Sequence, residues 1–402
     1  MAYTIKAFRA THYNPRLIKN FSTVTCPPYD VINKKQEFLL KNKSPYNFCN
    51  ILLTDNGNYK ALGQKFRQWV SKKILFADTK ESLYLYEQKF TIHGKRYVRF
   101  GVLGLLRMDG KKAIFPHEYT LKAPKIDRKK IISEVKANLS PVFVIASRPS
   151  KILKITYRHY SKTRPFLKFK DTDGNPSRVW KIENSSWIKK LCEEFDKHKL
   201  VIADGHHRFE VSYNYYKKHK KEFAELNYIL AYITDAQSGL VILPTHRVVS
   251  VKNEADIFGP KVSEYFYINK TSEKELEKKL MQSKEFSFGV YRNKQFYFLR
   301  LKNRLILDKI FKGSVYKNLD TYILHKFVFT LCNIEGQPEY THELSEAKKL
   351  AGSDKAAFIL KPTPLAAVFK IANQGYRLPQ KSTYFYPKVS SGIVLRKFEK
   401  RR

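Results

Sequence analysis

The chain has 402 residues, of which 43% are hydrophobic and 14% are aromatic. Such a chain can bury a large core, so a disordered or fibrous protein is excluded. Its 76 Lys and Arg residues against 36 Asp and Glu residues give a formal net charge of +40, which suits contact with anions.

The charge by itself does not decide whether nucleic acid is a partner. A domain this basic can bind nucleic acid non-specifically through phosphate contacts. The lysines, however, are spread along the whole chain, and we find no helix-turn-helix, zinc-finger or RNA-recognition motif. A general lysine bias explains the charge better, so nucleic acid is an alternative partner that we do not favour.

The expected compartment follows from three further features. No apolar run approaches the ~20 residues of a membrane span, and the N-terminal residues lack the apolar core of a signal peptide. The four cysteines are widely spaced and form no CxxC pair, which argues against a structural zinc site and suits a reducing compartment. We therefore expect a cytoplasmic protein without membrane contact.

We divide the chain into three regions, the first of which, residues 1–110, is β-rich. Its strands are expected at 3–8 and 47–53, a helix at 58–73, and a β-hairpin at 83–106 with His93-Gly94 as its turn. The run Cys-Pro-Pro-Tyr-Asp-Val-Ile at 26–32 holds the chain extended. It predicts a rigid loop that presents Tyr29 and Asp30 to a substrate, with a plain structural turn as the alternative.

The second region, residues 111–250, contains the first catalytic candidates. His117 and Glu118 follow a short strand and a proline, and a carboxylate there can act as general base towards a hydroxyl group. His117 would assist the general base or bind phosphate. The alternative is that Glu118 is a capping residue and His117 a surface residue. A helix from Asp127 and a strand at 139–145 follow, residues 147–185 are lysine-rich and turn-rich, and 186–198 is helical.

The run Leu-Val-Ile-Ala-Asp-Gly-His-His-Arg-Phe-Glu at 200–210 is the centre of this region. Four apolar residues predict a buried strand, Asp204 and Gly205 break it, and a helix begins behind them. The amides and the positive dipole end of such a helix bind anions. We expect the phosphate ligands in this turn, and Asp204 is placed either to hold Mg²⁺ or to orient a hydroxyl group, with an ordinary N-cap as the alternative. The ligands are Gly205, His206, His207 and Arg208.

A second His-Arg pair, His246 and Arg247, follows the strand expected at 239–243. Two cationic pairs behind two buried strands predict convergence on one polyphosphate, with a structural ion pair of Arg247 as the alternative.

The third region, residues 251–402, is an α/β region that we expect to pack back on the core. Helices are expected at 273–281, 319–330 and 364–373, and strands at 286–290, 295–301 and 356–362. Lys381, Ser382 and Thr383 can neutralise and hydrogen-bond a phosphate, with a plain core strand as the alternative. No GxxxxGK[ST] or GxGxxG run is present, which excludes Walker-type, Rossmann-type and protein-kinase nucleotide loops.

Several of these stretches together resemble one family. The motifs at 26–32, 117–120, 139–141, 204–208, 239–247 and 381–388 resemble those of domain-of-unknown-function family 1015, in the same order. The Asp-Gly-His-x-Arg run also resembles the nucleotide-phosphate turn of the ParB/sulfiredoxin-like superfamily, which includes free-serine kinase. The resemblance implies an α/β (α+β) fold with mixed sheets, a ParB/sulfiredoxin-like core and flanking α/β regions, with Glu118 as catalytic base.

We therefore expect a nucleotide-dependent phosphotransferase that uses ATP or ADP with Mg²⁺ and acts on a small hydroxyl metabolite such as serine. The alternative is a nucleotide-gated binding or regulatory protein, in contact with nucleic acid and without catalysis. Sulfiredoxin-like chemistry needs a cysteine in the phosphate turn, where this chain has His206 and His207.

Overall fold

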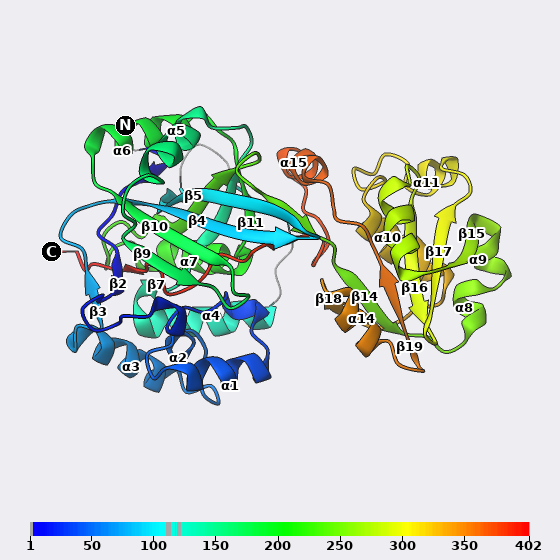
Figure 1. Cartoon of the computed structure of the whole chain (residues 1–402), viewed down its shortest axis with the longest axis horizontal. Coiled ribbons are helices and arrows are strands. Elements are labelled where there is room, and N and C mark those ends of the chain that lie inside the picture. Colours follow the sequence, from blue (N-terminus) through cyan, green and yellow to red (C-terminus); the bar gives the residue numbers. More distant parts are fainter. Residues whose placement is uncertain (1–2, 110–113, 117, 119–121, 402) are drawn as a thin grey trace. The chain divides into compact units, whose positions relative to one another are not determined.

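The computed structural model describes residues 3–109, 114–116, 118 and 122–401. The chain forms two compact units of mixed α/β structure, which confirms the expected fold class (Figure 1). Unit 1 consists of Met1–Pro116, Thr120–Leu240 and Pro387–Arg402, and unit 2 of His117–Tyr119 and Val241–Tyr386.

Unit 1 is built on one mixed sheet with the strand order β6-β11-β8-β12-β5-β4-β10-β9, and β1 pairs with β5. The pairs β11·β6 and β12·β8 are parallel, and the remaining pairs are antiparallel. Every residue of β12 is buried, as is usual for a strand covered on both faces. The strands are β1 (Ile5–Lys6), β4 (Leu83–Ile92), β5 (Lys95–Arg107), β6 (Ile114–Pro116), β8 (Val142–Ala146), β9 (Leu167–Lys170), β10 (Pro176–Ile182), β11 (Leu200–Asp204) and β12 (Tyr228–Asp235).

Helices cover this sheet. Leu153 of α5 and Leu191 and Phe195 of α6 join the apolar core of the strands, and α4 packs between α3 and α7. Two short strand pairs, β2 (Thr11–Tyr13) with β3 (Leu75–Ala77) and β7 (Ala137–Asn138) with β21 (Arg396–Lys397), complete the unit. The helices are η1 (Phe21–Thr23), η2 (Tyr29–Val31), α1 (Lys34–Lys43), α2 (Cys49–Leu52), α3 (Tyr59–Ser71), α4 (Lys122–Val135), α5 (Lys151–Tyr160), α6 (Ser185–Phe195) and α7 (His206–His219).

Unit 2 contains an antiparallel sheet of order β15-β17-β16-β19-β14-β18 and a separate pair, β13·β20. Its strands are β13 (Val241–Leu243), β14 (His246–Ser250), β15 (Phe266–Thr271), β16 (Ser287–Arg292), β17 (Gln295–Leu301), β18 (Glu339–Thr341), β19 (Lys355–Ile359) and β20 (Tyr384–Tyr386). Its helices are α8 (Glu254–Phe258), α9 (Pro260–Tyr265), α10 (Glu273–Gln282), α11 (Leu305–Ile310), α12 (Asp320–Ile323), the π-helical η3 (Leu324–Val328), α13 (Phe329–Leu331), α14 (Leu344–Leu350) and α15 (Leu365–Asn373).

Two local expectations were wrong. The stretch 47–53, expected as a strand, contains helix α2, because the Asn47 side chain accepts from the Cys49 amide and starts a turn. The stretch 147–185, expected to be turn-rich, contains helix α5, which Ser150 caps by accepting from the Leu153 amide at 3.0 Å.

The first two sequence regions share one sheet, because β5 pairs with β12 along six residues of each strand. The last residues of the third region, from Pro387, belong to unit 1, where β21 pairs with β7. The compact units are therefore assembled from segments that are separated in the sequence, and the division into residues 1–110, 111–250 and 251–402 stays a prediction.

Candidate phosphate-binding site

The turn between β11 and α7 has the geometry of an anion-binding helix start. Gly205 has φ +90°, a left-handed conformation that favours glycine, and its carbonyl accepts from the Phe209 amide at 2.9 Å to open the helix. As the N-cap residue, Gly205 has no side chain that could cap the first amides of α7. The positive end of a 14-residue helix therefore lies at this turn.

Asp204, the last residue of β11, is held between two cations. Its Oδ1 accepts from Lys388 Nζ at 2.6 Å, and its Oδ2 accepts from Arg208 Nη2 at 2.5 Å. Burial alone would raise the pKa of Asp204, but the positive charges of Lys388 and Arg208 outweigh it and lower this pKa well below its ordinary value. The side chains of all three residues are nearly buried, so the group is an ionised cluster with one excess positive charge.

Arg208 connects the turn to the neighbouring strand. Its Nη1 donates to the Pro141 carbonyl, and its guanidinium lies over Gly205, where a Cβ atom would come within 3.0 Å of it. Its Nε has no hydrogen-bond acceptor among the described residues. Because the side chain is only 10% exposed, the arginine is already oriented before any ligand arrives. Of the two histidines in the same turn, His206 is buried and His207 is half-buried.

The Pro-Pro-Tyr-Asp loop lies within electrostatic reach of this turn. Burial and the charge of Asp30 raise the pKa of Tyr29, and the charges of Arg128, Arg208 and Asp204 also act on it. The Tyr29 ring is half-buried and stacks on the Arg128 guanidinium, 3.8 Å from the ring centroid, whereas Asp30 is exposed. Within unit 1, Tyr29 therefore contacts Arg128, and the charges of Asp204 and Arg208 act on it.

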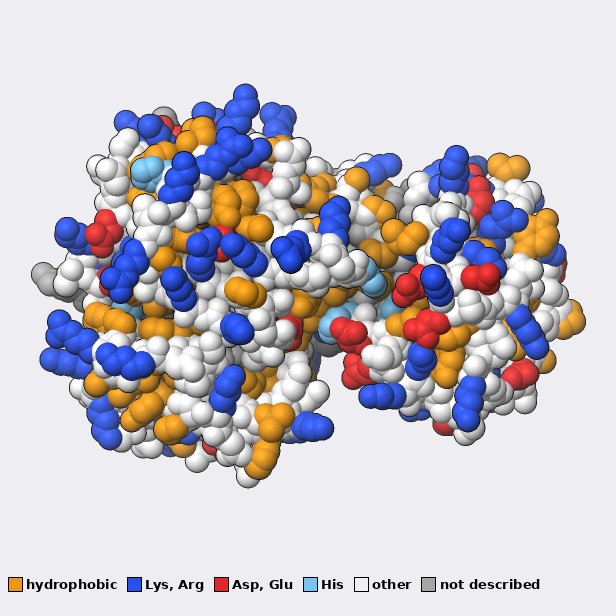
Figure 2. Space-filling model, in the orientation of Figure 1, with side chains coloured by type: hydrophobic (Ala, Val, Ile, Leu, Met, Phe, Trp, Pro, Cys, Tyr) orange, Lys and Arg blue, Asp and Glu red, His pale blue; other side chains and the backbone are white. Residues whose placement is uncertain are grey.

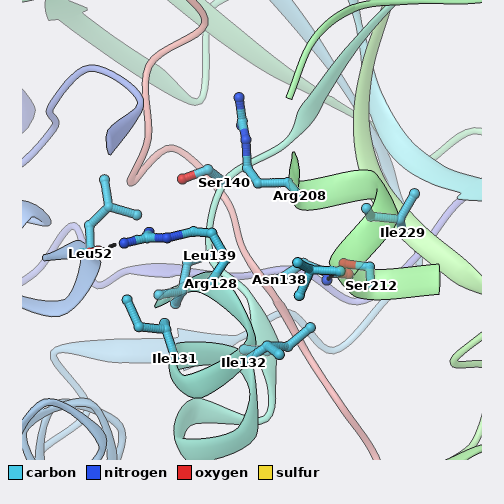
Figure 3. Close-up of a pocket in the computed structure, with 12 residues that line it drawn as sticks. Leu52, Arg128, Ile131, Ile132, Asn138, Leu139, Ser140, Arg208, Ser212 and Ile229 are labelled. Carbon is cyan, nitrogen blue, oxygen red and sulfur yellow. Dashed lines mark hydrogen bonds between the residues drawn. The ribbon is translucent and has the colours of Figure 1, made fainter. Parts of the chain in front are cut away.

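A small cavity of about 50 Å³ lies beneath the turn (Figure 3). This volume holds a few water molecules and is too small for a nucleotide, so any nucleotide would have to lie outside it. Mostly apolar side chains surround the polar groups of Arg128, Arg208, Asn138, Ser140 and Ser212.

The donor set at Asp204 does not fit a metal ion. Both carboxylate oxygens of Asp204 already accept a hydrogen bond from a cation. To bind there, Mg²⁺ would have to displace either Lys388 or Arg208, and the cation that remained would repel it. Within the described part of the chain, no group of three or more His, Cys, Asp or Glu side chains is placed to hold a metal.

In unit 2, the expected second cationic pair lies inside a sheet. His246 and Arg247 begin β14, which runs between β18 and β19. Arg247 is fully buried: it donates to the Thr245 carbonyl, to the Lys381 carbonyl at 3.0 Å and to His325 Nε2 at 3.3 Å. Burial and the charge of Arg247 lower the pKa of His246 to about 4, so the imidazole is neutral. These contacts are structural, and convergence of both cationic pairs on one polyphosphate stays a prediction.

The segment Lys381 to Thr383 and Glu118 meet within unit 2. Glu118 Oε1 accepts from the Thr383 amide at 3.2 Å and from its hydroxyl at 3.1 Å, which fixes the carboxylate in one orientation. Ser382 is buried and donates to the Pro379 carbonyl at 2.6 Å. Lys381 has φ +55° and an exposed side chain. The other catalytic candidate of this stretch, His117, lies outside the described residues.

Sequence reasoning missed two side chains of the unit 1 site. Lys388 is the last residue of the family-like run at 381–388, in which the sequence predicts phosphate ligands only at 381–383. Arg128 stands beside Asp127 at the expected helix start, where a pairing with Tyr29 was not considered. The Leu-Ser-Pro motif gains a physical role, because the Pro141 carbonyl accepts from Arg208.

Solved structures give likenesses of low structural agreement. A mutant free serine kinase in complex with ADP is 12% identical, with a TM-score of 0.37 over 70% of this chain and 86% of that chain. SbnI with a C-terminal truncation, from Staphylococcus aureus, is 10% identical, with a TM-score of 0.39 over 73% of this chain and 86% of that chain. A conserved hypothetical protein from Pyrococcus furiosus is 13% identical, with a TM-score of 0.35 over 74% of this chain and 94% of that chain.

The remaining comparisons concern sequence and membrane topology. No curated protein sequence matches the chain. In the part of the chain that the structure describes, no helix has both the length and the apolar character that a bilayer span requires. The wider ParB/sulfiredoxin-like relationship stays a prediction. One family model matches residues 5–322, so the chain belongs to the family described as "Protein of unknown function (DUF1015)".

Proposed function

We propose that this protein binds the phosphate groups of ATP or ADP at the Gly205 turn and transfers one phosphoryl group to the hydroxyl of a small metabolite, such as serine. The observation that carries the proposal is the start of α7, where a left-handed glycine and the helix N-terminus lie beside two nearly buried cations, Arg208 of the helix and Lys388 of the C-terminal segment, both paired with Asp204. Amides and cations in this arrangement stabilise phosphate oxygens and the charge that develops on them during transfer.

The two cations have different parts in the proposal. Arg208 is held at the helix start by its bonds to Asp204 and the Pro141 carbonyl, and a planar guanidinium in this place suits phosphate oxygens. Lys388 supplies a second charge on the opposite oxygen of Asp204. Asp204 holds both cations in place, and its negative charge offsets one of the two, so it acts here as a positioning residue.

Glu118 is the proposed proton acceptor. In the reaction, the oxygen of the acceptor hydroxyl forms a bond to the terminal phosphorus of the nucleotide, and the bond from that phosphorus to the bridging oxygen breaks. The hydroxyl proton passes to the Glu118 carboxylate, and the nucleotide leaves with one phosphate fewer. Two hydrogen bonds from Thr383 hold Glu118 Oε1, so the carboxylate is oriented before the reaction.

The remaining candidates have subsidiary roles. Tyr29 and Asp30 are proposed to contact the acceptor, and Lys381 and Thr383 are proposed as secondary phosphate ligands. His246 and Arg247 are left to their structural role, because both are buried and all three guanidinium nitrogens of Arg247 already donate within unit 2. A Mg²⁺ ion, if required, is expected on the nucleotide phosphates and not on Asp204, whose oxygens are taken by Lys388 and Arg208. No step of the proposed reaction is assigned to the ion.

Binding and turnover can be tested separately. Isothermal titration of the full chain with ADP, ATP and AMP measures binding, and phosphoserine formation from serine measures transfer. Each charge-assisted hydrogen bond contributes about 1.5–3 kcal/mol, so Arg208→Ala and Lys388→Ala are each expected to weaken nucleotide binding about 10- to 100-fold.

Glu118→Gln keeps an oxygen acceptor for Thr383 but cannot take a proton at neutral pH. We expect it to bind nucleotide normally and to lose transfer at least about 100-fold. Lys220→Ala, which removes an exposed cation after the end of α7, is the matched charge control and should change neither quantity. Nucleotide binding that is unaffected by Arg208→Ala would contradict the phosphate site. Normal binding without turnover on any hydroxyl compound would instead favour a nucleotide-gated regulatory protein.

A further inference from the structure

Residues 147–170 of unit 1 carry a concentrated positive charge. This stretch contains eight Lys and Arg residues and no Asp or Glu. Helix α5 lies within it, between the Ser150 cap and Tyr160. A general lysine bias would leave carboxylates interspersed, as they are in α10 of unit 2, which contains three Glu among its ten residues.

The cations of α5 form one row on the helix. Lys151, Lys154 and Arg158 are spaced i, i+3 and i+7, which places them on the same face, about 4.5 to 6 Å apart along the axis. All three are exposed, and none forms an ion pair with a carboxylate among the described residues. Like charges at this spacing destabilise a helix by about 0.2–0.5 kcal/mol per pair, so the row carries a cost that a bound anion would remove.

An aromatic stack lies at the end of this row. The rings of His159 and Trp187 are stacked, with centroids 5.3 Å apart and an interplanar angle of 29°. Tyr160 contacts both rings edge-on, and Lys190 Nζ lies over the Trp187 ring at 5.5 Å. His159 is exposed, and Trp187 is half-buried. The stack therefore offers a planar surface beside a line of positive charges.

Figure 2 shows Lys and Arg side chains gathered over the part of unit 1 where Figure 1 labels α5 and α6. The charge on α6 is mixed further along that helix, where Lys189 lies 3.9 Å from Glu193. The proposed surface therefore consists of the cationic row of α5 together with Trp187 and Lys190 of α6.

We propose that this surface binds single-stranded nucleic acid. Phosphates of the strand contact Lys151, Lys154 and Arg158, and a base stacks on the exposed face of His159. Cationic tracks combined with aromatic platforms bind single strands with little sequence preference, because every base has a π-face. This surface is separate from the Gly205 turn, so its function does not depend on phosphotransfer.

The structure favours a nucleic acid over an anionic membrane. A membrane-surface helix needs a broad exposed apolar face. In α5 the side chains of Leu153 and Thr156 are buried, Ile152 and Tyr157 pack against the core, and Ile155 is exposed by 49%. One isolated isoleucine does not provide such a face, whereas phosphate and base contacts use the groups that α5 does expose.

The interaction is measured by the fluorescence anisotropy of a labelled, mixed-sequence RNA. The RNA has about 16 nucleotides, which is the upper end of the length that one single-strand-binding domain contacts. A DNA strand of the same sequence and the RNA duplex are run in parallel. The test variant is Lys151→Glu/Lys154→Glu/Arg158→Glu, expected to weaken binding at least about 10-fold. It should also lower the slope of log K against log salt by about 2, since each lost phosphate contact on a single strand removes about 0.7.

The control variant is Lys270→Glu/Lys274→Glu/Lys278→Glu in unit 2, which reverses three exposed cations. Both triple variants lower the net charge from +40 by six, so they are matched in overall charge. Only the α5 variant is expected to lose binding. A separate readout is the fluorescence of Trp187, because Trp69 and Trp180 are buried. Bound RNA should quench it, and Trp187→Phe should remove the response.

Three results would overturn the proposal. Equal loss in both variants would show that overall charge alone attracts the strand. Tighter binding of the duplex than of either single strand would remove the role of stacking. If the wild type bound phosphatidylserine vesicles but not RNA, and the α5 variant did not bind the vesicles, the surface would be a membrane-binding surface instead. Circular dichroism spectra that match the wild type confirm that these surface variants are folded.

Discussion

The two units contain the same local pattern, a histidine and an arginine close behind a short apolar strand, and they use it in opposite ways. In unit 1, Gly205 ends the strand, and Arg208 lies at a helix N-terminus with its Nε lacking an acceptor in the described chain. In unit 2, Arg247 continues into a strand between two others, and its guanidinium donates to two carbonyl groups and one imidazole.

The difference teaches that the backbone decides what surrounds a cationic pair: a helix start in unit 1 and the strands of a sheet in unit 2. A left-handed glycine turns the chain into a helix, whose first amides receive no side-chain cap, and Arg208 lies beside them with bonds to Asp204 and the Pro141 carbonyl. In unit 2 no such glycine stands between the apolar strand and the histidine-arginine pair, the chain stays extended, and the guanidinium of Arg247 donates to groups of the sheet and of the neighbouring segments.

The largest expected effect is on the stability of unit 2. Arg247→Ala removes a fully buried side chain and leaves the Thr245 and Lys381 carbonyls without this donor, which should cost about 3–5 kcal/mol. Arg208→Ala should cost about 1–2 kcal/mol, because Lys388 still neutralises Asp204. Urea unfolding by circular dichroism measures both units, whereas tryptophan fluorescence reports unit 1, which contains Trp69, Trp180 and Trp187. If both variants lowered the free energy of unfolding equally, the two arginines would not differ in their structural role, and the comparison of the two units would be wrong.

A smaller effect is expected in acid. Burial, followed by the charge of Arg247, lowers the pKa values of His246 and His325 from 6.5 to about 4. Between pH 6.5 and 4 the unfolded chain binds protons that the folded unit does not, so this stability is complete above pH 6.5 and is lost as the pH falls towards 4. The loss should be on the order of 2 kcal/mol per histidine.

Urea midpoints measured at pH 7, 5.5 and 4.5 check this expectation. His246→Asn keeps an acceptor for the Leu360 amide but does not titrate, so its midpoint should fall less with pH than that of the wild type. A wild-type midpoint that does not change across this window would contradict the burial of two neutral imidazoles.

The smallest effect on stability separates backbone strain from ligand binding. Gly205→Ala and Gly174→Ala both place a side chain at positive φ, +90° and +82°, and each should cost about 1 kcal/mol. A Cβ at Gly205 comes within 3.0 Å of the Arg208 guanidinium, whereas nothing lies within 4 Å of one at Gly174. Titration with ADP should therefore detect weaker binding in Gly205→Ala alone. Equal binding by both variants would argue against Arg208 as a phosphate ligand.

Much of the local structure could be predicted from pattern. The hairpin around His93-Gly94, the helix at 58–73 and the strand-turn-helix run at 200–210 follow from alternation, helical spacing and glycine placement, and all three are confirmed. Helix α5 was missed because the surrounding stretch 147–185 is rich in lysine and turn residues, and only the apolar residues 152, 153, 157 and 160 of this short helix pack against the core. Only contact with the sheet core shows that this face is buried.

The sequence by itself determined the family, the mixed α/β class and the position of the glycine turn, because these depend on residue types at short spacing. The tertiary structure alone decided which charged groups meet. Lys388 reaches Asp204 across 184 residues, Arg208 reaches the Pro141 carbonyl across 67, and Tyr29 stacks on Arg128. No local pattern encodes such pairs, because the free energy of a buried charge depends on which partners the folded chain brings within a few ångströms.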